Sequence, residues 1–146
     1  MQMMAKIDPP LAYRLDDQIG YLLRLASQRH ATIFQALTIN GLTPTQFSAL
    51  IRISEQGKCS QNRLGRLAAM DVATIKGVVD RLRQKGLIAI EPDPNDKRRT
   101  LISLSPTGTD LVTRMQDVGH AITAETLNPL SAAEQRSLLK LLQKLG

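Results

Sequence analysis

Apolar residues recur at helical spacing along the first part of the chain. Between Pro10 and Asn40 they return at the period of one face of an α-helix. The pair Pro9-Pro10 suits the start of a helix, and Asn40-Gly41 suits its end. We therefore predict one long helix of about 30 residues. The positions on which this prediction rests are Leu11, Leu15, Ile19, Leu22, Ala26, Ile33 and Leu37.

Three shorter helices are predicted in the middle of the chain. Thr43 and Gln46 form a capping box at the start of the first, which Gly57 ends. Ser60 can cap a short second helix, and Asp71 can cap the third. The apolar residues of the third helix lie on one face, at Val72, Ile75, Val78, Val79 and Leu82.

The pattern then changes from helical to strand-like. Residues 87–90 and 100–104 predict two short strands, and residues 91–99 between them are rich in turn formers and charge. This predicts a β-hairpin with a long, basic tip. Two more helices are predicted after it, one from Ser105-Pro106 and one from a capping box of Ser131 and Glu134.

The order of these elements predicts a mainly α fold with a small β-hairpin, a winged helix-turn-helix flanked by N- and C-terminal helices. We expect one domain over residues 1–146, in which 43–105 form the winged helix-turn-helix and 8–41 and 106–146 form the dimerisation helices. The last helix has more leucines than a single chain needs to bury, which favours a homodimer with two-fold symmetry. The alternative is that this helix packs back on the first one.

The composition bounds the class of protein. Over 146 residues, 42% hydrophobic and 22% charged residues are typical of one soluble globular domain. No apolar run approaches the ~20 residues of a membrane span, and the first ten residues lack the apolar core of a signal peptide. Cys59 is the single cysteine and cannot form an internal disulfide, so we expect a protein of the reducing cytoplasm with no membrane partner.

The positive charge is concentrated in the middle of the chain. The formal net charge is +6, and residues 58–99 hold ten basic and five acidic residues, so nearly all the excess lies there. Such a concentration is typical of nucleic-acid binding. All four aromatic residues lie before residue 48, so this segment has no platform on which single-stranded bases could stack. The expected partner is therefore double-stranded DNA.

The helix after Asp71 is the predicted recognition helix. In a helix-turn-helix the second helix enters the major groove with its N-terminal residues leading. Ala73, Thr74, Lys76 and Gly77 lie on its polar face near that end, and Arg81 is expected to meet phosphate. The alternative is a plain surface helix, since any amphipathic helix has a polar face.

The basic hairpin supplies the second part of the predicted interface. Arginine is the preferred insert in a narrow minor groove, and Asp96 lies two residues before Arg98, where it can aim that side chain. A solvated charge run is the alternative. The full set expected to bind DNA is Ser60, Gln61, Asn62, Ala73, Thr74, Lys76, Gly77, Arg81, Asp96, Lys97, Arg98 and Arg99. The operator is expected to be a palindrome with half-sites about one helical turn apart.

Five segments, taken in order, carry a family resemblance: residues 42–47, 64–67, 79–87, 93–99 and 104–108. They resemble the MarR family of bacterial transcriptional regulators, and the Asp96-x-Arg98 pair is the most specific of them. The resemblance implies a dimeric winged helix-turn-helix protein whose terminal helices form the dimer. It also implies that a small, often aromatic and anionic ligand relieves repression by binding between the dimerisation and DNA-binding parts.

The resemblance suggests residues for such a ligand. Some members hold a ligand carboxylate with Arg and His from the first helix, which here implies Arg24 and His30, with Phe34 and Phe47 as aromatic lining. The expected effector is an aromatic carboxylate or its thioester. The alternative for His30 is a hydrogen-bonded core histidine. The chain lacks the reactive cysteine that oxidation-sensing members have near their start. It has only two histidines, whereas metal-sensing members need a cluster of His, Cys and carboxylates, so no metal or cofactor is expected.

The remaining classes are an enzyme and an architectural protein. Paired catalytic carboxylates, a phosphate-cradling glycine loop and a Ser/His/Asp set are not recognisable in the sequence, so an enzyme is not expected. A ligand-independent winged-helix protein that binds DNA through phosphates stays open.

Overall fold

A computed structural model describes residues 12–146 of the chain. Within this range six α-helices, a short 3-10 helix and a two-stranded antiparallel sheet confirm the predicted winged-helix architecture. The elements are η3 (Leu15–Asp17), α1 (Ile19–Leu37), α2 (Pro44–Gln56), α3 (Gln61–Leu67), α4 (Val72–Gln84), β1 (Ile88–Asp93), β2 (Asp96–Leu104), α5 (Pro106–Leu127) and α6 (Ala132–Leu145).

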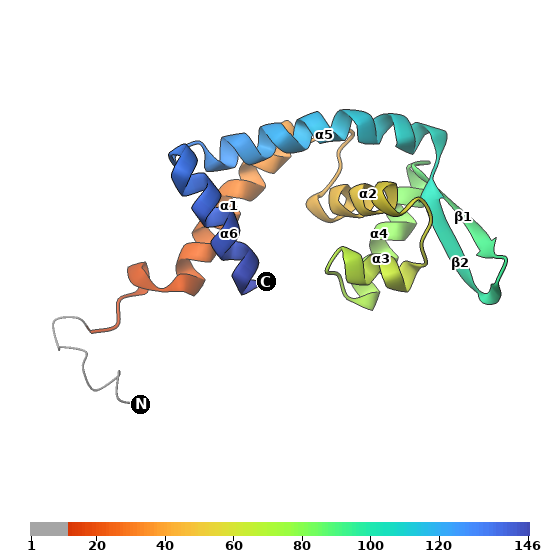
Figure 1. Ribbon diagram of the computed structural model, residues 1–146, viewed down its shortest axis with the longest axis horizontal. Helices are drawn as coiled ribbons and strands as arrows, with labels where there is room; N and C mark the ends of the chain where they lie inside the picture. The colour runs from red at the N-terminus through yellow and green to blue at the C-terminus, as the bar shows by residue number, and fades with distance from the viewer. Residues whose placement is uncertain (1–11) are drawn as a thin grey trace.

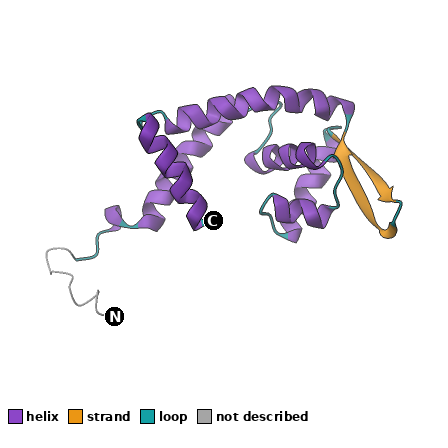
Figure 2. Cartoon of the chain, in the orientation of Figure 1, coloured by secondary structure: helices purple, strands orange, loops and turns teal. Residues whose placement is uncertain are grey.

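The long helix α5 connects the two parts of the molecule (Figure 1). Its N-terminal half contacts α2 and β2, and its C-terminal half contacts α1 and leads into α6. The hairpin extends away from the other elements at one edge (Figure 2). None of the helices in residues 12–146 is long and apolar enough to cross a membrane.

The core lies in the winged-helix part, between α2, α3, α4, the hairpin and the first half of α5. Full burial of each leucine or isoleucine side chain contributes roughly 1.5–3 kcal/mol to folding. The largest fully buried side chains are Leu42, Leu50, Ile53, Leu64, Ile75, Val79, Leu82, Ile102, Leu111 and Met115.

The predicted caps form at four helix starts. Thr43 and Gln46 exchange hydrogen bonds as a capping box, and so do Ser131 and Glu134. The Ser60 and Asp71 side chains each accept a hydrogen bond from a main-chain N–H in the first turn of their helix. These local signals fix where each helix begins.

The first helix is shorter than predicted. It begins at Ile19 after the separate turn η3, because Gln18 is extended, with φ −89° and ψ 136°. The Gln18 side-chain amide donates to the Arg14 carbonyl at 2.9 Å and stabilises this break. The predicted start at Pro9-Pro10 lies outside the described residues. The helix also ends earlier, at Leu37, where Thr38 leaves the helical conformation.

The strands of the hairpin are longer than predicted, and the loop between them is shorter. The strands reach Asp93 and start again at Asp96, so the turn consists of Pro94 and Asn95 and the long loop is absent. Two aspartate side chains tighten this turn: Asp93 accepts from the Asn95 N–H at 2.9 Å, and Asp96 accepts from the Arg98 N–H at 3.0 Å. The basic residues 97–99 therefore lie on β2.

Candidate nucleic-acid interface

Helix α4 presents small side chains at its N-terminal end. The Asp71 carboxylate accepts from the Thr74 N–H at 2.7 Å, and this hydrogen bond holds the pKa of Asp71 below its usual range. Ala73, Thr74 and Gly77 follow on the exposed face, and a β-carbon at Gly77 would meet open space. A duplex can therefore approach the backbone of this helix closely.

Two basic side chains continue this exposed face toward the C-terminal end of α4. Lys76 forms an ion pair with Asp80 over 3.0 Å, and both side chains are more than half exposed. Arg81 lies one turn after Gly77 and is exposed. An exposed ion pair of this kind contributes little, so a DNA phosphate or base can compete with Asp80 for Lys76.

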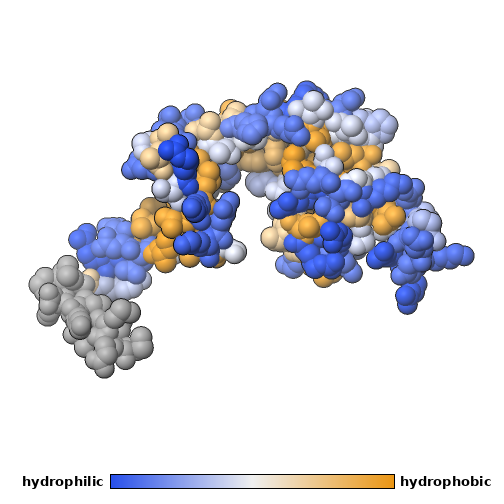
Figure 3. All heavy atoms as spheres, viewed as in Figure 1, coloured by the Kyte–Doolittle hydropathy of each residue, from blue (hydrophilic) through white to orange (hydrophobic). Residues whose placement is uncertain are grey.

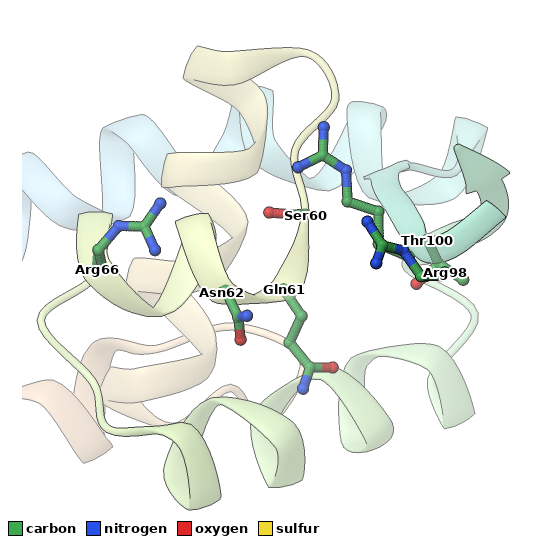
Figure 4. Close-up of a pocket in the computed structure, with 7 residues that line it drawn as sticks. Ser60, Gln61, Asn62, Arg66, Arg98 and Thr100 are labelled. Atoms are coloured by element: carbon green, nitrogen blue, oxygen red, sulfur yellow. The ribbon is translucent and has the colours of Figure 1, made fainter. Parts of the chain in front are cut away.

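A groove of about 400 Å³ separates α3 from β2. In the part of the chain that the structure describes, its lining includes three arginines and no acidic side chain. Figure 4 shows Arg66 at one end of the groove, Arg98 and Thr100 at the other, and Asn62 and Gln61 between them. The residues that line it are Ser60, Gln61, Asn62, Arg66, Arg98, Arg99 and Thr100.

The predicted pairing of Asp96 with Arg98 is present in the hairpin. The Arg98 Nε donates to Asp96 Oδ1 over 3.2 Å, and the Arg98 side chain is 91% exposed. Hydrogen bonds from Arg98 hold the pKa of Asp96 below its usual range. Lys97 is also exposed. The hairpin tip therefore presents Arg98 with its Nε held by Asp96 and with most of its side chain open to solvent.

Arg99 is held differently from its neighbour. Its Nε donates to Oδ2 of Asp93 over 2.6 Å, and the Asp93 side chain is almost fully buried. Hydrogen bonds from the Asn95 N–H and from Arg99 hold the pKa of Asp93 below its usual range. Sequence reasoning missed Asp93 because a carboxylate in a turn-rich segment looks like any solvated turn former.

The structure places the predicted DNA-binding residues on two surfaces. Ser60, Gln61, Asn62, Arg98 and Arg99 meet around the groove. The α4 residues lie outside its lining, on the adjacent helix. Arg66 and Thr100 line the groove and were not predicted. Arg66 lies two residues after the buried Leu64 on the short helix α3, and this helical spacing was the signal that could have identified it.

A second cavity, of about 450 Å³, lies between α1, α2 and α5. The Phe34 and Phe47 rings meet edge to face there, with centroids 5.6 Å apart, and the His30 ring lies 6.4 Å from Phe34. The lining is mostly apolar with a few polar groups, as is common for small-molecule sites. The residues are His30, Phe34, Pro44, Phe47, Ser48, Ile51, Met115, Gln116, Gly119, His120, Ile122 and Thr123.

Three of the four predicted ligand residues line this cavity, and Arg24 does not. Its guanidinium lies over the ring of Tyr21, 5.6 Å from the centroid. His30 shares a hydrogen bond of 2.9 Å with the Thr126 hydroxyl. Arg29 donates to the main-chain carbonyls of Glu125 and Thr126, so α1 is tied to the C-terminal end of α5 beside the cavity. His120 was not predicted to lie here.

The described residues contain no group of three or more His, Cys, Asp or Glu side chains that could hold a metal ion. Cys59 is buried, and this burial raises the pKa of its thiol. Its main chain pairs with Ile102 of β2, with N···O distances of 3.1 and 2.8 Å. The side chain thus fills space at the base of the hairpin.

Apolar side chains stay exposed on η3, α1 and α6 of the single chain (Figure 3). α6 has no buried residue, so packing back on α1 does not cover its leucines. Large apolar side chains exposed in this number are typical of a protein interface. The exposed side chains are Leu15, Ile19, Leu22, Leu23, Leu25, Leu37, Leu139, Leu141, Leu142 and Leu145.

Comparison with known proteins places this fold among transcriptional regulators. The sequence profile of the MarR family matches residues 42–100, from the α1–α2 connection into β2. The HTH-type transcriptional repressor NicR of Pseudomonas putida is 37% identical over 134 residues, which cover 91% of this chain and 85% of NicR.

Two solved structures extend the similarity over nearly the whole chain. A probable transcriptional regulator from Pseudomonas aeruginosa is 53% identical, with a TM-score of 0.89, and the match covers 91% of this chain and 100% of that one. BpsR of Bordetella bronchiseptica, whose DNA binding is regulated by 6-hydroxynicotinic acid, is 39% identical with a TM-score of 0.86, over 91% of this chain and 96% of BpsR.

Proposed function

Since the chain belongs to the MarR family of transcriptional regulators, we propose that this repressor binds its operator as a homodimer and is released by a small aromatic acid. The observation that carries the second half of this proposal is the aromatic cavity between α1, α2 and α5. It lies between the apolar α1 surface and the helices of the winged-helix part, where a ligand could change their spacing.

The proposed DNA-binding part spans residues 43–105, and residues 8–41 and 106–146 form the dimerisation part. The N-terminal end of α4, with Thr74 and Lys76, reads base edges in the major groove. Arg98 enters the adjacent minor groove, and Arg81 meets phosphate. The groove lined by Gln61, Asn62 and Arg66 accepts the phosphate backbone between these two contacts.

The effector is proposed to be an aromatic carboxylate. The edges and faces of Phe34 and Phe47 offer apolar contact to one ring, and His30 offers a hydrogen bond or a positive charge to the carboxylate. Arg24 joins the site by leaving Tyr21 or by acting across the dimer. The regulation of BpsR by 6-hydroxynicotinic acid supports an effector of this class.

Release from the operator requires more free energy than a single contact between protein and ligand provides. Moving a dimer from 99:1 to 1:99 between its DNA-competent and incompetent states takes about 5.5 kcal/mol of differential binding. One charge-assisted hydrogen bond contributes about 1.5–3 kcal/mol. Two sites per dimer, each adding apolar contact, are sufficient. We therefore expect two ligands per dimer.

The test of the effector is calorimetric titration of benzoates, hydroxybenzoates and pyridine carboxylates into the wild-type protein, followed by operator release assays. His30→Ala and Arg24→Ala are expected to weaken ligand binding and release while leaving operator affinity nearly unchanged. Gln28→Ala, at an exposed position of the same helix, is the control. Equal ligand binding by all four proteins would place the effector site elsewhere.

The proposed mode of DNA binding is tested with two variants that should lose different properties of operator binding. Lys76→Ala is expected to relax discrimination between operator variants by ~1–3 kcal/mol, because it removes a base contact. Arg98→Ala is expected to weaken binding and to abolish preference for an A·T-rich flank. Protection of DNA without two-fold symmetry, insensitive to sequence, would favour a ligand-independent architectural protein instead.

A further inference from the structure

Asp93 is the only charged residue that is buried among residues 12–146, with 3% of its surface exposed. It ends β1, at the point where the pairing of the two strands shifts register. Burial of a carboxylate is costly unless it is paired and hydrogen-bonded. Both oxygens of Asp93 are used: Oδ1 accepts from the Asn95 N–H at 2.9 Å, and Oδ2 accepts from Arg99 Nε at 2.6 Å.

The two arginines at the tip are thus given different partners. Arg99 is bound to the buried Asp93, whereas Arg98 is bound to the partly exposed Asp96 and extends into solvent. The strand pairing goes from Pro92–Thr100 directly to Asp93–Asp96, so residues 97–99 fall at the irregularity and have no partner on β1 to hold them in register. The bond from Arg99 to the buried Asp93 therefore fixes this irregular segment, and with it the direction in which the adjacent Arg98 extends.

We propose that Asp93 is a positioning residue for DNA binding, which holds Arg99 and thereby the irregular segment 97–99, so that Arg98 is presented to the minor groove. Asp93 acts through Arg99 and makes no DNA contact of its own. The inference rests on the proposed role of the hairpin in DNA binding, and it assigns Arg99 a structural task in addition to its place in the groove.

The substitution Asp93→Asn tests the inference, because a pure charge effect and a positioning role predict opposite changes in operator affinity. Removing a negative charge from a DNA-binding surface should strengthen binding if only electrostatics matter. The asparagine still accepts from the Asn95 N–H, but it loses the charge-assisted bond to Arg99. We expect operator affinity to fall about tenfold and the preference for an A·T-rich flank to disappear.

The matched control is Glu91→Gln. It removes the same charge from the same strand, where Glu91 is exposed and pairs with Lys58. Its operator affinity is expected to be unchanged or slightly higher, with the flank preference intact. The unfolding temperature of each variant, measured alongside, separates a misplaced hairpin from a destabilised fold.

A second variant keeps the test decisive if Asp93→Asn does not fold. Arg99→Lys retains the positive charge but loses the Nε donor, and the same loss of flank preference is expected. If Asp93→Asn folds and binds the operator with normal affinity and flank preference, the inference is wrong. If Asp93→Asn does not fold, normal affinity and flank preference in Arg99→Lys overturn the inference. Either result leaves the DNA-binding role of the hairpin in place. Normal binding by Arg98→Ala would instead remove the proposed role of the hairpin, and the inference with it.

Discussion

Gly108 in the first turn of α5 packs directly on the main chain of Leu87, so a β-carbon at residue 108 would overlap the Leu87 carbonyl oxygen. Nearby, the Ser105 hydroxyl donates to the Gly86 carbonyl at 2.7 Å, and the main-chain N–H of Ser105 donates to the Leu87 carbonyl at 3.0 Å. These contacts join α5 to the end of α4. The connection between the two parts of the molecule therefore depends on a residue with no side chain.

Gly108→Ala is expected to destabilise the fold by about 1–3 kcal/mol or more, because the new methyl group must displace main-chain atoms rather than a flexible side chain. Urea unfolding followed by circular dichroism measures the change in the free energy of unfolding. Gly77→Ala is the control, since a β-carbon there meets open space. Equal stability of the Gly108 variant and the wild type would contradict the packing described here.

Gly77→Ala should separate stability from function. In the interior of α4 an alanine is expected to stabilise the helix by roughly 0.5–1 kcal/mol, because glycine loses more backbone entropy on folding. The added methyl group lies on the surface proposed to approach DNA, so operator affinity should fall while the unfolding temperature rises. Unchanged affinity in a binding titration would show that this part of α4 does not approach the duplex closely.

The sequence predicted the winged-helix architecture because the signals for it are local. The capping boxes at Thr43 and Ser131, the caps at Ser60 and Asp71, and the apolar face of α4 act within a few residues. The break at Gln18 was missed because the apolar positions on its two sides keep the same phase. Periodicity has no means of detecting an interruption that preserves that phase.

The parts of the site that escaped prediction depend on tertiary contacts. His120 and Thr123 line the aromatic cavity only because α5 passes α1 and α2. Burial of Asp93 follows from the position of the hairpin against the rest of the fold, and the sequence shows only a carboxylate among turn formers. His30 was expected to hold a ligand or to be a hydrogen-bonded core histidine, and its hydrogen bond to Thr126 beside the cavity could not be read from the sequence because Thr126 lies 96 residues away.

The acid stability of the fold should depend on Asp71. Its pKa is lowered in the folded state by the Thr74 hydrogen bonds, relative to about 3.9 in an unfolded chain. The cap therefore contributes fully above the unfolded pKa, and its contribution is lost as the pH falls through the folded pKa, where the unfolded state binds more protons. Stability should thus decline below about pH 4.

Asp71→Asn tests this contribution because asparagine caps a helix about as well but does not titrate. At neutral pH the variant should unfold at nearly the wild-type temperature. Between about pH 5 and pH 3 it should lose less of its free energy of unfolding than the wild type. Parallel curves for the two proteins over that range would mean that other carboxylates account for the acid sensitivity.

The proposed dimer leads to a prediction about α6. Leu141 is 57% exposed in the single chain, so its replacement should leave the fold of one chain intact. In an apolar interface, however, an isolated carboxylate would be buried without a partner, at a cost of several kcal/mol. Leu141→Glu is therefore expected to dissociate the dimer at micromolar concentration, as measured by sedimentation equilibrium.

The control for this variant is Gln143→Glu, which adds the same charge at another exposed position of the same helix. It should remain dimeric, which excludes an effect of net charge. Because a palindromic operator offers one half-site to each subunit, Leu141→Glu should also bind the full operator no more tightly than a half-site. A wild-type protein that sediments as a monomer would refute the dimer, and a dimeric Leu141→Glu would place the interface away from this face of α6.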